Sequence, residues 1–223
     1  MKVSVIIPVL NEADQIAETL ASLAPYRNQG HEVIVVDGGS SDETQSLAAM
    51  HADKVLHRNM GRAQQMNRGI DEARGDVLLF LHADTRLPSN GLKEVISAVE
   101  DGGFWGRFNV RLSGEHFMLR VIERMMNLRS CVTGVATGDQ AMFVSRESVA
   151  IVGQFPQIPL MEDVVFSKRL RELAWPVCVR QHVTTSSRRW EHRGVFRTVL
   201  LMWRLRLLFF LGVSADKLAR QYQ

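Results

Sequence analysis

The sequence predicts an α/β fold in which helices flank a mostly parallel sheet. Three observations support this prediction. In the first hundred residues, short apolar runs rich in Val, Ile and Leu alternate with longer polar or amphipathic runs. The apolar runs are bounded by Pro, Gly, Asn and Asp, which is typical of strands buried on both faces. The runs between them are long enough to form the helical crossovers that parallel strands require.

The predicted elements alternate along this half of the chain. We expect strands at residues 2–9, 32–37, 54–57 and 76–81, and helices at about 11–23, 43–52, 61–73 and 90–100. Asn11 and Asp14 can cap the first helix, and Ser40 and Asp42 can cap the second, because their side-chain oxygens accept hydrogen bonds from free backbone N–H groups. The pattern is that of repeated strand–helix units, which build one parallel sheet.

The second half of the sequence is less regular. Strands are expected at 104–112, 140–145 and 176–183, and helices at 115–129 and 162–173. The polar stretch at 184–193 is typical of a loop. We expect one domain at residues 1–190 and a basic, amphipathic helical segment at residues 191–223.

Composition restricts the class of protein. The 223 residues are 46% hydrophobic and 23% charged, which excludes disordered and collagen-like proteins. Two cysteines, Cys131 and Cys178, are too few for a disulfide scaffold or a four-cysteine zinc site, and we expect both to be reduced. The opening apolar run is too short for a signal peptide, and no run reaches the roughly 18 residues of a transmembrane helix. These features predict a cytoplasmic location.

The net charge of +3 conceals an uneven distribution. Residues 1–167 hold 15 basic and 21 acidic side chains, whereas residues 168–223 hold 12 basic and 3 acidic ones. A basic tail on an acidic body predicts contact with an anionic surface. Lipid headgroups, phosphates and nucleic acid all satisfy that description.

The most apolar part of the tail, residues 196–211, also carries arginines. Arg197 and Arg204, and with them Arg193, have the spacing of one helical face. The large apolar side chains are those of Trp203, Phe209 and Phe210. This pattern is typical of an interfacial helix and predicts peripheral contact with the inner membrane face. A terminal helix packed into the core and a homodimer interface fit the same pattern.

Parallel sheets bind ligands at the carboxyl ends of their strands, which selects residues 8–12, 37–42 and 82–86. Asp37 ends a buried strand and Gly38 follows it. The carboxylate can therefore bind a nucleoside, and the glycine lets a ligand approach the backbone. A helix cap with turn glycines accounts for the same residues.

Asp84 follows the fourth strand, where an acidic residue is typical of a Mg²⁺ or Mn²⁺ ligand beside a diphosphate. A turn aspartate before Pro88 is the alternative. His82 suits Mn²⁺ better than Mg²⁺, although a lone histidine is more often structural. Glu162 and Asp163 open a helix, whose dipole favours ionised carboxylates that can act as bases; ordinary helix-end charges give the same pattern.

In order and spacing, these segments resemble the family 2 glycosyltransferases, which have the GT-A nucleotide-sugar-binding fold. The similar segments are residues 3–12 (VSVIIPVLNE), 35–44 (VVDGGSSDET), 61–70 (GRAQQMNRGI) and 75–84 (GDVLLFLHAD). Glu162-Asp163 matches the family's catalytic Glu-Asp pair, and Arg188-Arg189-Trp190 resembles the Arg-Trp element of some members. The resemblance covers roughly residues 2–190 and indicates a small, stand-alone member of bacterial type.

The resemblance implies an inverting, nucleotide-sugar-dependent, hexosyltransferase-like enzyme. Asp163 would be the general base beside Glu162, and Asp84 would bind a Mg²⁺ or Mn²⁺ ion that stabilises the departing nucleoside diphosphate. The implied donor-binding residues are Pro8, Asn11, Glu12, Asp37, Gly38, Arg62, Asn67, His82, Ala83 and Asp84. The residues implied on the acceptor or phosphate side are Arg188, Arg189 and Trp190. The expected partners are a nucleotide-sugar donor and a glycan or lipid-linked acceptor, with no nucleic acid.

One position departs from the family pattern, because His82 stands where the metal motif has its first aspartate. The preference for one metal therefore stays open. Two other functions also stay open: a sugar-nucleotide nucleotidyltransferase and a non-catalytic nucleotide- or glycan-binding module on the same fold. The segment 8–14 lacks the glycine-rich phosphate loop of the former, and the pair Glu162-Asp163 argues against the latter.

Overall fold

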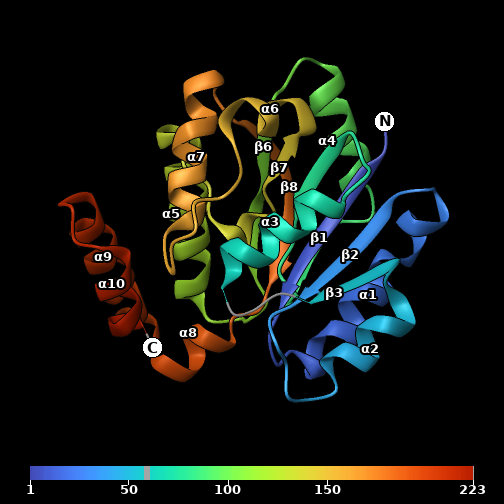
Figure 1. The fold of residues 1–223 in the computed structure, drawn as a ribbon. Coiled ribbons are helices and arrows are strands. Elements are labelled where there is room, and N and C mark those ends of the chain that lie inside the picture. Colours follow the sequence, from blue (N-terminus) through green and yellow to red (C-terminus); the bar gives the residue numbers. More distant parts are fainter. Residues whose placement is uncertain (58–60, 223) are drawn as a thin grey trace.

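The computed structural model describes residues 1–57 and 61–222, without the side chains of Arg189, His192 and Arg193. Within these residues, eight strands form one sheet in the order β3-β2-β1-β4-β7-β6-β8-β5 (Figure 1). The first half of the sheet consists of β1 (Val3–Val9), β2 (Glu32–Asp37), β3 (Lys54–His57) and β4 (Val77–Phe80), all paired in parallel. The predicted α/β fold and these four strands are confirmed.

The other half of the sheet is mixed. It consists of β5 (Thr85–Arg86), β6 (Trp105–Leu112), β7 (Phe143–Ser145) and β8 (Val177–Thr185). β7 runs antiparallel to both β4 and β6, whereas β6 and β8 are parallel. Since β7 joins the two halves, its short antiparallel segment connects the parallel sheet to the elements that follow it.

Helices cover both faces of the sheet (Figure 1). One face packs against α1 (Ala13–Asn28), α2 (Thr44–His51) and α4 (Gly91–Glu100), and the other against α3 (Arg62–Glu72), α6 (Arg146–Val152) and α7 (Glu162–Leu173). Strand β1 shows why: Val5 and Ile7 point to the first face, and Ile6 points to the second. Alternating burial of this kind follows from the two-residue period of a strand.

The remaining helices are α5 (Phe117–Thr133), α8 (Arg188–Arg193), α9 (Val195–Phe210) and α10 (Ala215–Tyr222). Helices α8 and α9 pack against α5 and β6 through an apolar cluster that includes Trp190 and Leu119. A second cluster joins Leu205 of α9 and Leu218 of α10 to Met161, just before α7. The C-terminal helices are thus attached to the domain, and the division after residue 190 stays a prediction. No helix in the described ranges is long and apolar enough to cross a membrane.

Two predicted boundaries are wrong because tertiary contacts extend the elements. Helix α1 continues past Pro25 to Asn28, since the Tyr26 hydroxyl accepts the Gly91 N–H at 3.0 Å and donates to a backbone carbonyl. The stretch 184–193 is not a loop: β8 continues to Thr185 through pairing with β6 and β5, and α8 follows.

The expectation of two reduced cysteines is also wrong. Cys131 at the end of α5 and Cys178 in β8 form a disulfide, with Cα atoms 6.2 Å apart. The two positions are 47 residues apart in the sequence. They meet because α5 packs on β6 while β8 pairs with β6, a long-range arrangement that residue spacing does not reveal.

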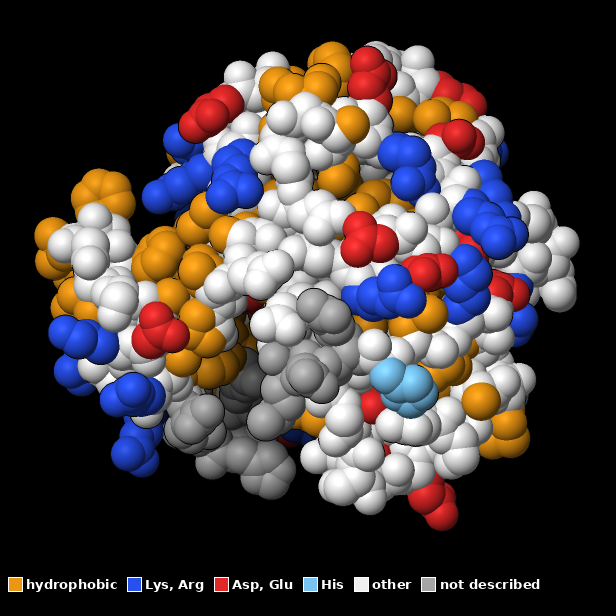
Figure 2. Space-filling model, viewed as in Figure 1, with side chains coloured by type: hydrophobic (Ala, Val, Ile, Leu, Met, Phe, Trp, Pro, Cys, Tyr) orange, Lys and Arg blue, Asp and Glu red, His pale blue; other side chains and the backbone are white. Residues whose placement is uncertain are grey.

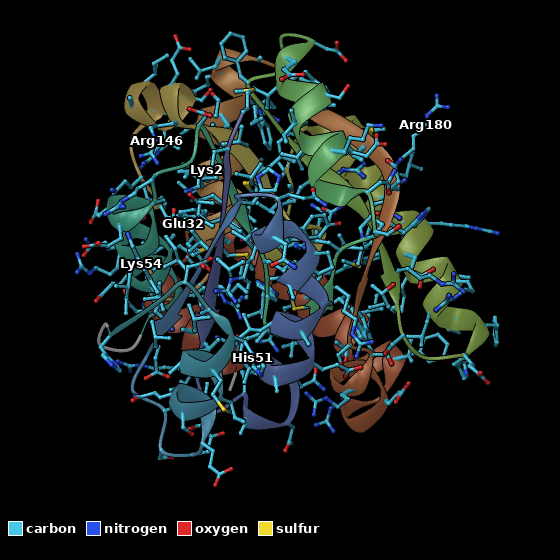
Figure 3. All side chains as sticks on the ribbon, turned by 90° about the vertical axis from the view of Figure 1, so that its right-hand side faces the viewer. Lys2, Glu32, His51, Lys54, Arg146 and Arg180 are labelled. Carbon is cyan, nitrogen blue, oxygen red and sulfur yellow. A yellow bond between two sulfur atoms is a disulfide. The ribbon has the colours of Figure 1, made fainter. Side chains whose placement is uncertain are left out.

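A buried carboxylate connects β1, β2 and β3 near their amino ends (Figure 3). Glu32 accepts the Ser4 hydroxyl at 2.7 Å and the Arg74 N–H at 2.9 Å, and the Lys54 ammonium lies 3.6 Å away. Burial raises the pKa of Glu32, but these donors outweigh it, so the net pKa lies below its ordinary value. The charge is therefore satisfied at the end of the sheet opposite the strand carboxyl ends.

Gly69 tests how closely α3 packs on β1. A methyl group at this position would lie 2.4 Å from Cγ2 of Ile6, which is fully buried. Overpacking of this kind costs about 1–3 kcal/mol, which exceeds the gain of up to about 1 kcal/mol from replacing a helical glycine by alanine. We expect Gly69→Ala to lower the free energy of unfolding measured in urea. In an Ile6→Ala background the same change should become neutral or stabilising, and equal destabilisation in both backgrounds would contradict this packing.

Candidate functional site

A cleft of about 320 Å³ lies where β1 and β4 end, and it also receives residues from the C-terminal helices. Many of the residues that the sequence predicts for the site line it together. They are Pro8, Glu12, Arg62, His82, Ala83, Asp84, Glu162, Asp163, Arg188 and Trp190. Parallel pairing of β1 with β4 brings two of these segments to one edge of the sheet, as expected for α/β proteins.

The donor half of the cleft contains two neighbouring carboxylates. Burial raises the pKa of Glu12, the Asp84 charge raises it further, and Arg188, His82 and Arg62 oppose this shift. The Asp84 carboxylate accepts the Thr85 hydroxyl at 3.2 Å and the Thr185 hydroxyl at 3.4 Å, both long hydrogen bonds. The mutual repulsion of Glu12 and Asp84, and the long hydrogen bonds of Asp84, make this part of the cleft attractive to a cation.

The pair Glu162-Asp163 begins α7 at the other side of the cleft. Met161 precedes it with a left-handed φ of 67°, so the chain turns sharply into the helix. Glu162 is buried, and burial together with the Asp163 charge raises its pKa, which Arg62 partly offsets. Asp163 accepts the Gly138 N–H at 3.0 Å and the Val164 N–H at 2.7 Å, which orients its carboxylate.

His82 lies between the donor-side carboxylates, Glu12 and Asp84, and the pair Glu162-Asp163. Its Nδ1 is 3.3 Å from a carboxylate oxygen of Asp139, and its Nε2 is buried without a partner among the described residues. A methyl group on Gly138 would lie 2.3 Å from that Nε2 atom. The absence of a side chain at residue 138 therefore allows the imidazole and the backbone N–H that holds Asp163 to occupy adjacent positions.

Asp37 and Gly38 do not line the cleft. The fully buried Asp37 carboxylate accepts the backbone N–H groups of Gly39 and Ser40 and the side-chain amide of Gln45, at 2.8–3.0 Å. Burial raises the pKa of Asp37, but these donors bring it below its ordinary value. In this structure the carboxylate caps its own turn, which is the structural alternative that the sequence left open.

Asn11 and Asn67 also lie outside the cleft. The Asn11 side chain accepts the Ser41 N–H at 2.9 Å and so joins the loops after β1 and β2. The Asn67 side-chain amide donates to the Phe155 carbonyl at 2.9 Å and accepts the Phe155 N–H at 3.0 Å. Donor binding by these residues stays a prediction, and the predicted Arg189 side chain lies outside the described residues.

Sequence reasoning missed a further set of cleft residues. It comprises Leu112, Thr137, Gly138, Asp139, Leu160, Met161, Val164, Thr185, Ser186, Thr198, Met202, Arg206 and Tyr222. The dipeptide Gly138-Asp139 was the visible signal, because it combines a turn former with a carboxylate just before a strand. The others are ordinary helix, strand and loop residues that only the fold brings to the cleft.

A divalent cation in this cleft would need oxygen atoms from a bound ligand in addition to the protein's own side chains. The described residues contain no group of three or more His, Cys, Asp or Glu side chains that could hold a metal ion. Asp84 nevertheless offers a weakly hydrogen-bonded carboxylate, and Mg²⁺ or Mn²⁺ is commonly held by one or two carboxylates together with substrate phosphates. The donor set therefore fits a cation shared between Asp84 and a diphosphate.

Comparison with known families decides the assignment. The model for the family "Glycosyl transferase family 2" matches residues 4–148, well over half of the chain. The chain belongs to the glycosyl transferase family 2. The matched region ends before Glu162-Asp163, so the match covers the segments around Asp84 and leaves the second carboxylate pair outside it.

Two curated relatives have a lipid phosphate in their names, undecaprenyl-phosphate in one and dolichol-phosphate in the other. An undecaprenyl-phosphate 4-deoxy-4-formamido-L-arabinose transferase from Enterobacter sp. is 27% identical over 150 residues, covering 62% of this chain and 46% of the relative. A dolichol-phosphate mannosyltransferase from Pyrococcus furiosus is 34% identical over 109 residues, covering 46% of this chain and 31% of the relative. The chain therefore spans less than half the length of either relative.

Solved structures show the same GT-A fold. The mannosyltransferase PcManGT from Pyrobaculum calidifontis, in complex with GDP-Man and Mn²⁺, superposes with a TM-score of 0.69 at 20% identity, covering 92% of this chain and 60% of that one. Glucosyl-3-phosphoglycerate synthase from Mycobacterium tuberculosis, in complex with Mn²⁺ and UDP, gives 0.62 at 19% identity, with 82% and 70% coverage. The predicted family and fold are confirmed.

Glu162 gives a test of the cleft's electrostatics. Because its folded-state pKa is raised, the folded protein holds this proton more tightly than the unfolded chain does, and stability falls as pH rises through that pKa. We expect Glu162→Gln to lose less stability than the wild type between about pH 5 and about pH 8. Chemical denaturation at both pH values measures this, with Glu100→Gln at an exposed position as the control. An identical pH dependence in Glu162→Gln and wild type would contradict the raised pKa.

Proposed function

We propose that this protein is an inverting glycosyltransferase, which moves a sugar from a nucleotide-sugar donor to an acceptor hydroxyl with Asp163 as general base. The observation that carries the proposal is the shared cleft of Asp84 and Glu162-Asp163, which are nearly eighty residues apart in the sequence. One carboxylate can hold a metal-bound diphosphate there while the other faces an incoming hydroxyl. Family membership and the GT-A fold support this assignment.

The donor would occupy the side of the cleft formed by Pro8, Glu12, Arg62 and Asp84. Arg62 can pair with phosphate oxygens because its guanidinium donates several hydrogen bonds in a fixed geometry. Asp84 would hold a Mg²⁺ or Mn²⁺ ion, which when bound neutralises charge that develops on the departing nucleoside diphosphate. His82, held by Asp139, would keep this loop in place.

Asp163 would act on the acceptor. As the acceptor oxygen forms its bond to the anomeric carbon, the bond to the diphosphate oxygen breaks and the hydroxyl proton passes to Asp163. The hydrogen bond from the Gly138 N–H fixes the direction of the Asp163 carboxylate. Another lone pair of that carboxylate stays free to accept the proton. Attack from the face opposite the leaving group inverts the anomeric carbon in one displacement, so no covalent sugar–enzyme intermediate is required.

The variant Asp163→Asn tests the base. We expect transfer from UDP- and GDP-sugars to polyprenyl-phosphate or glycan acceptors to fall by about 10²–10⁴-fold, the usual contribution of a general base. Donor binding should survive, measured as a melting shift with Mn²⁺ and nucleotide, because a ligand at 100 times its dissociation constant adds about 2.7 kcal/mol of stability.

Two matched variants complete this experiment. Asp84→Ala should lose the metal-dependent part of the nucleotide shift, and Asp216→Asn, at an exposed position on α10, should behave as the wild type. Transfer at the wild-type rate by Asp163→Asn would exclude Asp163 as the base. A folded protein that no nucleotide stabilises in the presence of metal would contradict the donor site itself.

We also propose that α9 rests on an anionic membrane surface near the acceptor. The helix exposes a stripe of apolar side chains at three- and four-residue spacing: Phe196, Leu200, Trp203, Leu207 and Phe210. It contains no acidic residue, and Arg197 and Arg204 are exposed beside the stripe. Figure 2 shows hydrophobic side chains gathered over the C-terminal helices, with Lys and Arg side chains next to them. Apolar area edged by arginines matches a surface of acyl chains and anionic headgroups.

Trp203 and Phe210 make this proposal testable with vesicles. We expect Trp203→Ser/Phe210→Ser to reduce co-sedimentation with phosphatidylglycerol-containing liposomes by ten-fold or more, since fully burying each side chain is worth about 1.5–3 kcal/mol. Trp175→Ser is the matched control, because Trp175 is 56% exposed and Trp203 is 57% exposed. Unchanged liposome binding by the double variant, or a dimer in lipid-free solution that the double variant dissociates, would contradict membrane contact.

A further inference from the structure

The wall of the cleft beyond Asp163 comes from the C-terminal helices. Thr198, Met202 and Arg206 of α9 and Tyr222 of α10 line the cleft together with Asp163 and Asp139. Leu205 is fully buried against Met161 and Leu218, which fixes the rotation of α9 about its axis. As a result, Arg206 points inward to the cleft.

Helix α9 exposes large apolar side chains and turns a charged side chain inward, which is the reverse of the usual arrangement. Its large apolar residues at positions 196, 200, 203, 207 and 210 are exposed, while the guanidinium of Arg206 faces the interior. Burying an arginine costs free energy unless its donors are satisfied, and the Arg206 Nε is buried without a partner among the described residues. A leucine at this position would pack at no such cost, so the arginine requires a role other than packing.

A second arginine lies close by. Arg129 of α5 donates from Nη1 to the Val135 carbonyl at 3.3 Å, while its Nε and Nη2 are buried and have no partner within the part of the chain that is described. Burial and the nearby Arg206 charge lower the pKa of Arg129 to about 10. The charges of Asp163 and Asp139 act on both arginines and partly offset their repulsion.

We propose that Arg206, which lines the cleft, binds an anionic group of the acceptor, a phosphate or a carboxylate, next to Asp163. Arg129 does not line the cleft, but its charge acts on Arg206 from nearby and adds to the positive potential there. A guanidinium recognises such anions because its N–H pairs match the spacing of two anionic oxygens. An anion here would relieve the repulsion between the two cations. It would also hold the acceptor on the side of Asp163 away from Asp84. This inference rests on the proposed glycosyl transfer and adds the chemical class of the acceptor.

Inorganic phosphate and D-glucuronate serve as probes, titrated into the metal-free full-length protein and followed by its melting temperature. We expect Arg206→Gln to bind phosphate at least ten-fold more weakly than the wild type. Arg204→Gln, on the exposed side of the same helix, removes the same charge and should bind as the wild type does. Arg62→Gln reports phosphate that binds on the donor side, so phosphate affinity lost in Arg62→Gln and kept in Arg206→Gln would assign the bound phosphate to the donor site. Arg206→Lys keeps the positive charge but lacks the forked N–H pairs of a guanidinium, so we expect an intermediate loss of phosphate affinity. This variant provides the test if Arg206→Gln folds poorly.

The two probes distinguish the source of the anion. Phosphate preferred ten-fold or more over glucuronate indicates a phosphorylated acceptor, and similar binding of both indicates an acidic sugar; each result supports the site. Wild-type phosphate affinity in a folded Arg206 variant, absence of phosphate binding by the wild type, or dependence on Arg62 in place of Arg206 would overturn it. Because the titration needs neither donor nor turnover, a failure of the proposed transferase activity would appear separately, in the nucleotide and transfer measurements.

Discussion

The site depends on the position of β4 in the sheet. Parallel pairing with β1 and antiparallel pairing with β7 place the chain leaving β4, with His82 and Asp84, beside the chain entering β7, with Gly138. The Gly138 N–H then hydrogen-bonds Asp163 at the start of α7. One strand therefore sets the distance between the group that would bind the diphosphate and the group that would accept the acceptor's proton.

The cleft divides its charge between two sides. Glu12 and Asp84 give the donor side carboxylates for a cation, and Arg62 gives it a guanidinium for a diphosphate; burial raises the pKa of Glu12, and the nearby Asp84 charge raises it further. Arg206 lines a positive side next to Asp163, with Arg129 nearby, and both have buried donors that find no partner among the residues that the structure describes. The proposed transfer from a nucleotide-sugar to an acidic acceptor would use both kinds of surface, because each substrate must be held while the anomeric carbon and the acceptor oxygen approach each other.

Helix α9 links this cleft to the outer surface. Its inner side supplies Arg206 to the proposed acceptor site, and its outer side exposes an apolar stripe with arginines. The two proposals made for this helix are independent, since one concerns residue 206 and the other residues 203 and 210. If both hold, an acceptor with an anionic group and an apolar part would lie within reach of Asp163.

The sequence by itself determined the parallel half of the sheet, α7 and the segments around Asp84 and Glu162-Asp163, because these rest on local periodicity, turn residues and a family-specific order. Asp37 shows the limit of that reasoning, since its motif fitted both a nucleoside-binding carboxylate and a cap of its own turn, and only the contacts of the fold show the turn hydrogen bonds. Only the tertiary structure decided the pairing of β7 with β4 and β6, the pairing of β8 with β6 and β5, the disulfide, α8, and the placement of Gly138 and Arg206 at the cleft. These features arise from contacts between residues distant in the chain, and such contacts depend on how packed elements face one another, which a local pattern of residue types does not encode.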